Sequence, residues 1–196
     1  MNQFWKMNRL WIFIAVFWAV GCSNSPFVDV IIETSEGTIE LEIDTVAAPI
    51  SGANFLKYVD AGLYEDGSFF RVVTMENQPS DSIRIEVIQG GANPDSRDTF
   101  FDAITLERTS DTGLLHLNGT ISLARSTPDS ATHSFFICIG DQPSLDFGGM
   151  RNPDGQGFAA FGRVVKGMHV VTKIQAGAVD AQNLIEPVSI LGARRK

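Results

Sequence analysis

Cysteine is scarce in this sequence, with two residues among 196. Two cysteines are too few for a disulfide framework. Cys22 ends an apolar N-terminal segment, whereas Cys138 lies in the apolar run 135–139, a setting typical of a buried, inert thiol. We therefore expect no disulfide bond between them.

Basic residues are in the minority. Fifteen Lys and Arg stand against 23 Asp and Glu, which gives a formal net charge of −8 and a pI near 4.8. Such a balance repels phosphate backbones and anionic lipid, so we expect no nucleic-acid partner.

Motifs for common cofactor and hydrolytic chemistry are missing. The sequence has no G-x-S-x-G nucleophile elbow and no Walker A loop. His116, His133 and His169 stand far apart, without metal-ligand spacing, and each is expected in a loop or on the surface. Asp146 has no obvious carboxylate partner. We expect neither a metal nor a cofactor.

No apolar run is long enough to span a bilayer. After Lys6 and Arg9, the apolar stretch 10–20 has about eleven residues, whereas a span needs roughly 20. The small residues before Cys22 resemble a bacterial lipoprotein processing site; the alternative is an ordinary cleaved signal that happens to end in cysteine.

The N-terminal pattern therefore predicts a signal peptide over 1–22, lipidation of Cys22 and a short tether over 23–27. We expect an exported protein that is lipid-anchored to the cell envelope, at the periplasmic or outer-membrane face if the organism has two membranes.

The remaining chain is mainly β. Residues 28–34 and 38–43 predict a hairpin, and Pro49 suits the first turn of a helix that ends at Gly62. Further expected elements are strands over 69–73, 83–89, 120–124, 134–139, 159–165 and 187–191, and a helix over 168–174. These patterns indicate one barrel or sandwich domain over 28–193, followed by a basic tail over 194–196.

Four groups of segments resemble the cyclophilin family, in the family's order. They are APISGANF at 48–55 with the turn at 62–64; FFRVV at 69–73 with VIQGG at 87–91; GTISLAR at 119–125 with DSAT at 129–132 and SFFI at 134–137; and FAAFGRVVKGM at 158–168. The resemblance covers 28–193 and is nearest to the bacterial exported branch.

This resemblance implies a closed eight-stranded antiparallel barrel capped by two helices. It also implies a monomeric peptidyl-prolyl cis/trans isomerase that acts on proline-containing polypeptides without a cofactor. Arg71 matches the catalytic arginine, and Gln89 matches the glutamine that orients it. The implied substrate-binding residues are Phe69, Val87, Ala124, Arg125, Phe136, Leu145 and Phe158. Phe136 matches the floor of the proline pocket, although apolar strand residues could equally be barrel core.

Some positions depart from the family pattern. Glu86 falls where an aromatic pocket wall is expected, and Ser134 replaces a glutamine that helps to hold the substrate. About ten extra residues lie between Arg71 and Gln89, and we expect this insertion to tune substrate choice.

Two other functions fit parts of the sequence. The main alternative is a weakly catalytic or non-catalytic module that binds proline-containing segments, which Glu86 and Ser134 favour. A lipocalin-like carrier is the other, but the helix at Pro49 comes too early for a meander of strands.

Overall fold

The computed structural model describes residues 1, 26–78 and 82–196. Residues 2–22 of the predicted leader, including Cys22, therefore lie outside the described residues, and so do residues 23–25 of the tether and 79–81 of the insertion. In the described part of the chain, no helix is long and apolar enough to cross a membrane.

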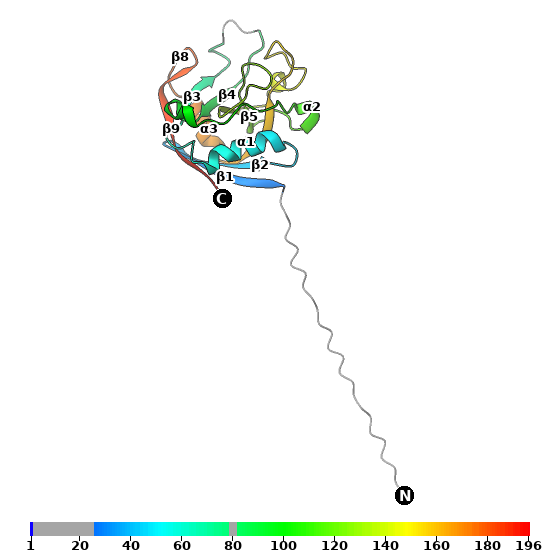
Figure 1. Cartoon of the computed structure of the whole chain (residues 1–196). Helices are drawn as coiled ribbons and strands as arrows, with labels where there is room; N and C mark the ends of the chain where they lie inside the picture. Colours follow the sequence, from blue (N-terminus) through cyan, green and yellow to red (C-terminus); the bar gives the residue numbers. More distant parts are fainter. Residues whose placement is uncertain (2–25, 79–81) are drawn as a thin grey trace.

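Eight strands of the described chain close into an antiparallel barrel (Figure 1). They are β1 (Phe27–Thr34), β2 (Gly37–Asp44), β3 (Ser68–Val73), β4 (Val87–Gly91), β5 (Thr120–Leu123), β6 (Phe135–Cys138), β7 (Ala159–Lys166) and β9 (Asn183–Arg195). Their order around the barrel is β1-β2-β7-β5-β6-β4-β3-β9, and β9 pairs back onto β1. The two-residue strand β8 (Val179–Asp180) forms a small hairpin with β9. The expected closed barrel is confirmed.

The first hairpin follows directly from the sequence pattern. Ile39, Leu41 and Ile43 of β2 are completely buried, whereas Glu40 and Glu42 between them face outward. Because successive strand residues point to opposite faces, this alternation places one face of β2 in the core.

Two helices cap the barrel, α1 (Pro49–Asp60) and α3 (Met168–Gln175) (Figure 1). Phe55 of α1 is fully buried and packs against Tyr64, Phe135 and Phe161, with ring centroids 5.2–5.6 Å apart. The carboxylate of Glu107 accepts hydrogen bonds from the backbone N–H groups of Ile50 (3.0 Å) and Ser51 (2.6 Å). A loop residue therefore caps the first turn of α1.

Short helices also occur in the irregular segments that the structure describes: η1 (Pro94–Thr99), α2 (Thr109–Thr112) and η2 (Pro143–Leu145). The strand expected over 83–89 begins only at Val87. The backbone of Ile85 instead hydrogen bonds to the side chain of Gln78, through its oxygen (2.8 Å) and its N–H (3.2 Å). The buried Gln78 side chain thus provides the hydrogen bonds that a neighbouring strand would otherwise make.

The C-terminal residues expected as a basic tail instead complete the last strand. Arg194 and Arg195 pair with Ile31 and Val30 of β1. The Arg195 guanidinium also donates to both carboxylate oxygens of Asp60, at 2.7 and 2.6 Å. The domain therefore extends to the end of β9.

Candidate active site

A second apolar cluster lies apart from the main core. Its buried members are Val73, Ile85, Val87, Phe136, Cys138 and Leu145, with Ala124 and Phe158 packed against them. The cluster borders a cavity of about 260 Å³ whose rim also includes Arg71, Gln89, Arg125 and residues 151–153. A small cavity with an apolar floor and convergent polar groups is typical of a ligand site.

Arg71 of β3 stands at the rim of this cavity and is held by two glutamines. Its Nη1 donates to Oε1 of Gln89, its partner on β4, at 2.8 Å. Its Nε and Nη2 donate to Oε1 of Gln182 at 3.0 and 2.5 Å. Because these bonds approach the planar guanidinium from two sides, they fix its orientation.

Ser134 extends this network. Gln89 Nε2 donates to the Ser134 hydroxyl at 3.0 Å, and that hydroxyl donates to the backbone oxygen of Gly90 at 3.1 Å. The serine therefore fixes which way the Gln89 amide points, so that its oxygen faces Arg71.

The floor and walls of the cavity are apolar. Phe136 is only 5% exposed and meets Phe158 edge-on, with ring centroids 5.4 Å apart. Leu145 is buried, and its backbone oxygen accepts a hydrogen bond from the Phe158 N–H at 2.9 Å. Val87 and Ala124 line the same space. The structure thus brings together all but one of the predicted site residues that it describes.

Phe69 is the exception, because it lies in the main core. It is fully buried and packs edge-on against Phe135 at 5.7 Å. In an unbroken strand Phe69 and Arg71 would share a face, but the register of β3 against β4 shifts between them. This bulge turns Arg71 toward the cavity and leaves Phe69 inside the barrel.

Arg125 anchors a loop beside the cavity. Its side chain is 1% exposed and donates to both carboxylate oxygens of Asp154, at 2.7 and 2.9 Å, and to the backbone oxygen of Gly157. The hydrogen bond from Arg125 lowers the pKa of Asp154. The guanidinium also lies over the Phe158 ring, 5.1 Å from its centroid.

Glu86 does not line the cavity. Its carboxylate lies 3.5 Å from Nε2 of Gln175 on α3, and Ile85 provides the apolar wall instead. The alternation of side chains along an extended segment could have revealed this, because Ile85 and Val87 are two residues apart and Glu86 lies between them. No local pattern identifies Gln182 or residues 151–153.

The three histidines lie in loops or on the surface, as expected, but their exposure differs. His116 is buried, with Nδ1 2.7 Å from Asp146 Oδ1 and Nε2 2.9 Å from the Ser122 hydroxyl. Ser122 is completely buried, so this Ser-His-Asp array has no exposed nucleophile. His133 is half-buried, and burial lowers its pKa; only His169 is exposed.

Cys138 is completely buried, as expected, and burial raises the pKa of its thiol. Among the described residues, no three His, Cys, Asp or Glu side chains come together as a metal site.

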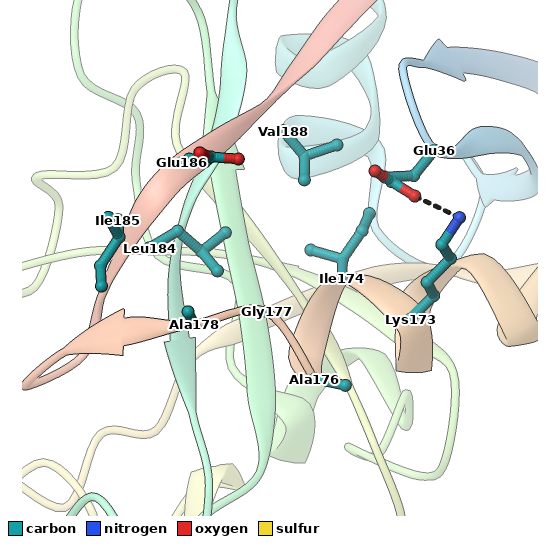
Figure 2. A pocket seen from close by; sticks show the side chains of 10 residues that line it. All are labelled: Glu36, Lys173, Ile174, Ala176, Gly177, Ala178, Leu184, Ile185, Glu186 and Val188. Atoms are coloured by element: carbon teal, nitrogen blue, oxygen red, sulfur yellow. Dashed lines mark ion pairs between the residues drawn. The ribbon is translucent and has the colours of Figure 1, made fainter.

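A wider cavity of about 540 Å³ lies between α3 and the β8–β9 hairpin (Figure 2). Ile174, Leu184 and Val188 line it, beside an ion pair of 2.5 Å between Lys173 and Glu36. Among the described residues, no aromatic or arginine side chain lines it. The polar groups suited to amide chemistry are in the smaller cavity.

Known proteins resemble the whole described domain. Residues 28–195 match the family model described as cyclophilin type peptidyl-prolyl cis-trans isomerase/CLD. Peptidyl-prolyl cis-trans isomerase A of Dickeya dadantii is 40% identical over 146 residues, which cover 74% of this chain and 70% of that protein. Peptidyl-prolyl cis-trans isomerase B of Escherichia coli is 31% identical over 156 residues, covering 79% of this chain and 88% of that protein.

A crystal structure of a Cryptosporidium parvum cyclophilin type peptidyl-prolyl cis-trans isomerase has the same fold. It matches with a TM-score of 0.66 at 20% identity and covers 87% of this chain and 98% of that chain. Together with the family model, these likenesses show that the chain belongs to the cyclophilin family and is a peptidyl-prolyl cis-trans isomerase.

Proposed function

We propose that Arg71 is the catalytic residue and that the cavity floored by Phe136 holds the proline ring of the substrate. Rotation about a peptide bond is slow because resonance gives the C–N bond double-bond character, with a barrier of roughly 18–20 kcal/mol. The reaction breaks no covalent bond, so it requires no nucleophile and no general base. A catalyst has to bind the proline and stabilise the twisted amide.

Arg71 suits the second task. As the amide twists, its nitrogen becomes pyramidal and can accept a hydrogen bond, which it does poorly in either planar isomer. A guanidinium aimed at this nitrogen therefore stabilises the transition state more than either ground state. The clamp formed by Gln89 and Gln182 supports this role, since it orients the donor before the substrate binds.

The cavity suits the first task. Val87, Phe136, Leu145 and Phe158 offer an apolar surface for the ring. Ala124 and Arg125 lie at the edge, where their main-chain groups can bind the substrate backbone. Because the Arg125 side chain is engaged with Asp154, we assign it to anchoring this edge rather than to binding charge on the substrate.

The observation that carries this proposal is that Arg71, oriented by hydrogen bonds to two glutamines, lies at the rim of a cavity with an apolar floor. The alternative, a binding module with little turnover, had Glu86 and Ser134 in its favour. Neither obstructs the cavity: the Glu86 carboxylate lies against Gln175, and Ser134 supports Gln89. We therefore favour the isomerase with Arg71 as its catalytic residue.

The catalytic test is cis-to-trans relaxation of a proline tetrapeptide by residues 23–196, compared with Arg71→Ala. We expect the variant to lose about a hundredfold in kcat/KM, the scale seen when one transition-state donor is removed. Arg163→Ala is the control, because the exposed Arg163 pairs with Glu42 on the outside of the barrel. Unchanged relaxation by Arg71→Ala would exclude the proposed catalytic role.

We further propose that the enzyme is exported and tethered by a lipid on Cys22, where it acts on proline-containing segments of exported polypeptides as a monomer. The charged start, short apolar stretch and small residues before Cys22 support this. Expression in a bacterium, detergent-phase partition and mass spectrometry of the N-terminus test it. Cys22→Ser should move the protein to the aqueous phase; an unmodified Cys22 in the wild type would contradict the anchor.

A further inference from the structure

A buried histidine lies directly against the floor of the proline pocket. The rings of His116 and Phe136 are stacked, with centroids 5.8 Å apart and planes 15° from parallel. The His116 side chain is completely buried, so it packs against Phe136 without reaching the cavity itself.

Hydrogen bonds at both nitrogens fix this ring. Oδ1 of Asp146 accepts from the His116 backbone N–H at 3.0 Å and lies 2.7 Å from Nδ1. A carboxylate only accepts, so Nδ1 carries a proton. In the neutral ring Nε2 is then the acceptor for the Ser122 hydroxyl, 2.9 Å away. A ring bonded at both nitrogens cannot rotate without breaking both bonds.

The two partners of His116 belong to the elements that build the pocket. Ser122 on β5 stands directly opposite Phe136 on β6 in the strand register. Asp146 follows Leu145, whose backbone oxygen holds Phe158. His116 thus connects the floor of the pocket with two of its walls.

We propose that His116 is a positioning residue, which supports Phe136 from behind and fixes the depth and tilt of the proline pocket. This inference rests on the proposed role of Phe136 as the pocket floor. Arg71 is held by a separate network of glutamines and Ser134. Loss of His116 should therefore weaken proline binding and leave the rate of the bound substrate nearly unchanged.

The test measures kcat and KM of the purified full-length protein and of His116→Gln on a proline tetrapeptide and on its pipecolyl analogue, which has a six-membered ring. His116→Gln removes the stacked ring, and we expect KM for the proline peptide to rise about tenfold, within the range of coupled contacts. The preference for proline over the larger ring should fall. Ser122→Ala removes only the bond to Nε2 and should act in the same direction, but less.

Two comparisons separate positioning from general destabilisation. Val59→Ala weakens the main core, which is a separate cluster from the one that contains Phe136, and should leave KM unchanged. In a Phe136→Leu background, His116→Gln should add little to the rise in KM, because both changes act on the same floor. If His116→Gln does not fold, the KM of Ser122→Ala is measured instead, in the wild-type and in the Phe136→Leu background.

If folded His116→Gln has the KM and the ring preference of the wild type, the positioning role is overturned. It is also overturned if the rise in KM caused by His116→Gln adds fully to the rise caused by Phe136→Leu. A fall in kcat at constant KM would also contradict it. If Phe136→Leu binds the proline peptide with wild-type KM, the proposed role of Phe136 as the pocket floor is wrong. If Phe136→Leu raises KM and His116→Gln does not, only the proposed role of His116 is wrong.

Discussion

Gln182 holds the guanidinium of Arg71, a residue 111 positions earlier in the chain, through a single side-chain oxygen. Gln182 lies in the turn of the β8–β9 hairpin, next to Ala181, which has a left-handed φ of 54°. Its own Nε2 donates to the backbone oxygen of Asn77 at 3.3 Å. The orientation of Arg71 therefore depends on both the hairpin and the insertion.

Gln182→Leu removes the acceptor of two charge-assisted hydrogen bonds from Arg71. It should lower kcat at least about tenfold and leave KM within twofold of the wild type. The reason is that Leu cannot accept from Arg71, while the pocket that binds proline is unchanged. Relaxation kinetics at several substrate concentrations give the two constants. Gln182→Glu keeps an acceptor and should retain most activity; equal losses in both variants would argue against this positioning role.

Replacing residues 74–82 with a short turn should change which tetrapeptides are preferred. The segment holds Gln182 through Asn77, and its Gln78 positions Ile85 in the pocket wall. We would measure kcat/KM over a series of residues preceding proline. The same order of preference in both proteins would show that the insertion does not tune substrate choice.

Glu107→Ala should destabilise the fold without changing the chemistry. It leaves the N–H groups of Ile50 and Ser51 without the carboxylate that caps α1, a loss of about 1–3 kcal/mol. For a domain of this size the melting temperature should fall by several degrees, roughly 2–4 °C per kcal/mol. Exposed Glu65 provides the control Glu65→Ala, whose melting temperature should equal that of the wild type.

The Asp60–Arg195 ion pair should make stability depend on pH in the acidic range. Hydrogen bonding to Arg195 lowers the pKa of Asp60 from its ordinary value of 3.8. Folding therefore favours the ionised carboxylate, and this contribution is present above pH 3.8 and is lost as the pH falls through the lower, folded-state pKa.

Arg195→Ala should consequently be less stable than the wild type at pH 7, by under about 1 kcal/mol because the pair is exposed. The difference should shrink as the pH falls below 3.8. Urea unfolding of both proteins at a series of pH values measures it. A difference that stays constant down to pH 2 would assign the effect to packing of the Arg195 stem.

The sequence predicts those elements whose pattern is local. The alternation in β2 and Pro49 at the start of α1 are set by neighbouring residues, and both were located correctly. The closed barrel and the family followed from motifs that keep their order along the chain. Arg71 and Gln89 belong to such motifs, and the structure brings them within hydrogen-bonding distance.

Features that depend on strand register or on tertiary contacts could not be predicted from local patterns. Phe69 was assigned to the site from the resemblance, and no local pattern reveals the register shift that leaves it inside the barrel. Gln182 reaches Arg71 only when β9 lies beside β3, and His116 is buried only because distant Asp146 and Ser122 meet its two nitrogens. Each of these features depends on a contact between residues that are far apart in the sequence or that belong to no recognisable sequence motif.

The pairing of β1 with β9 has a consequence for the order of folding. The first strand of the barrel, β1, pairs on one side with β9, which follows all the other strands in the sequence, so the barrel cannot close before β9 is present. Such a high contact order slows folding, because a long loop has to be ordered before the closing contacts form. The pairing of β1 with β9 is therefore expected to form late in folding, after the strands between them have been ordered.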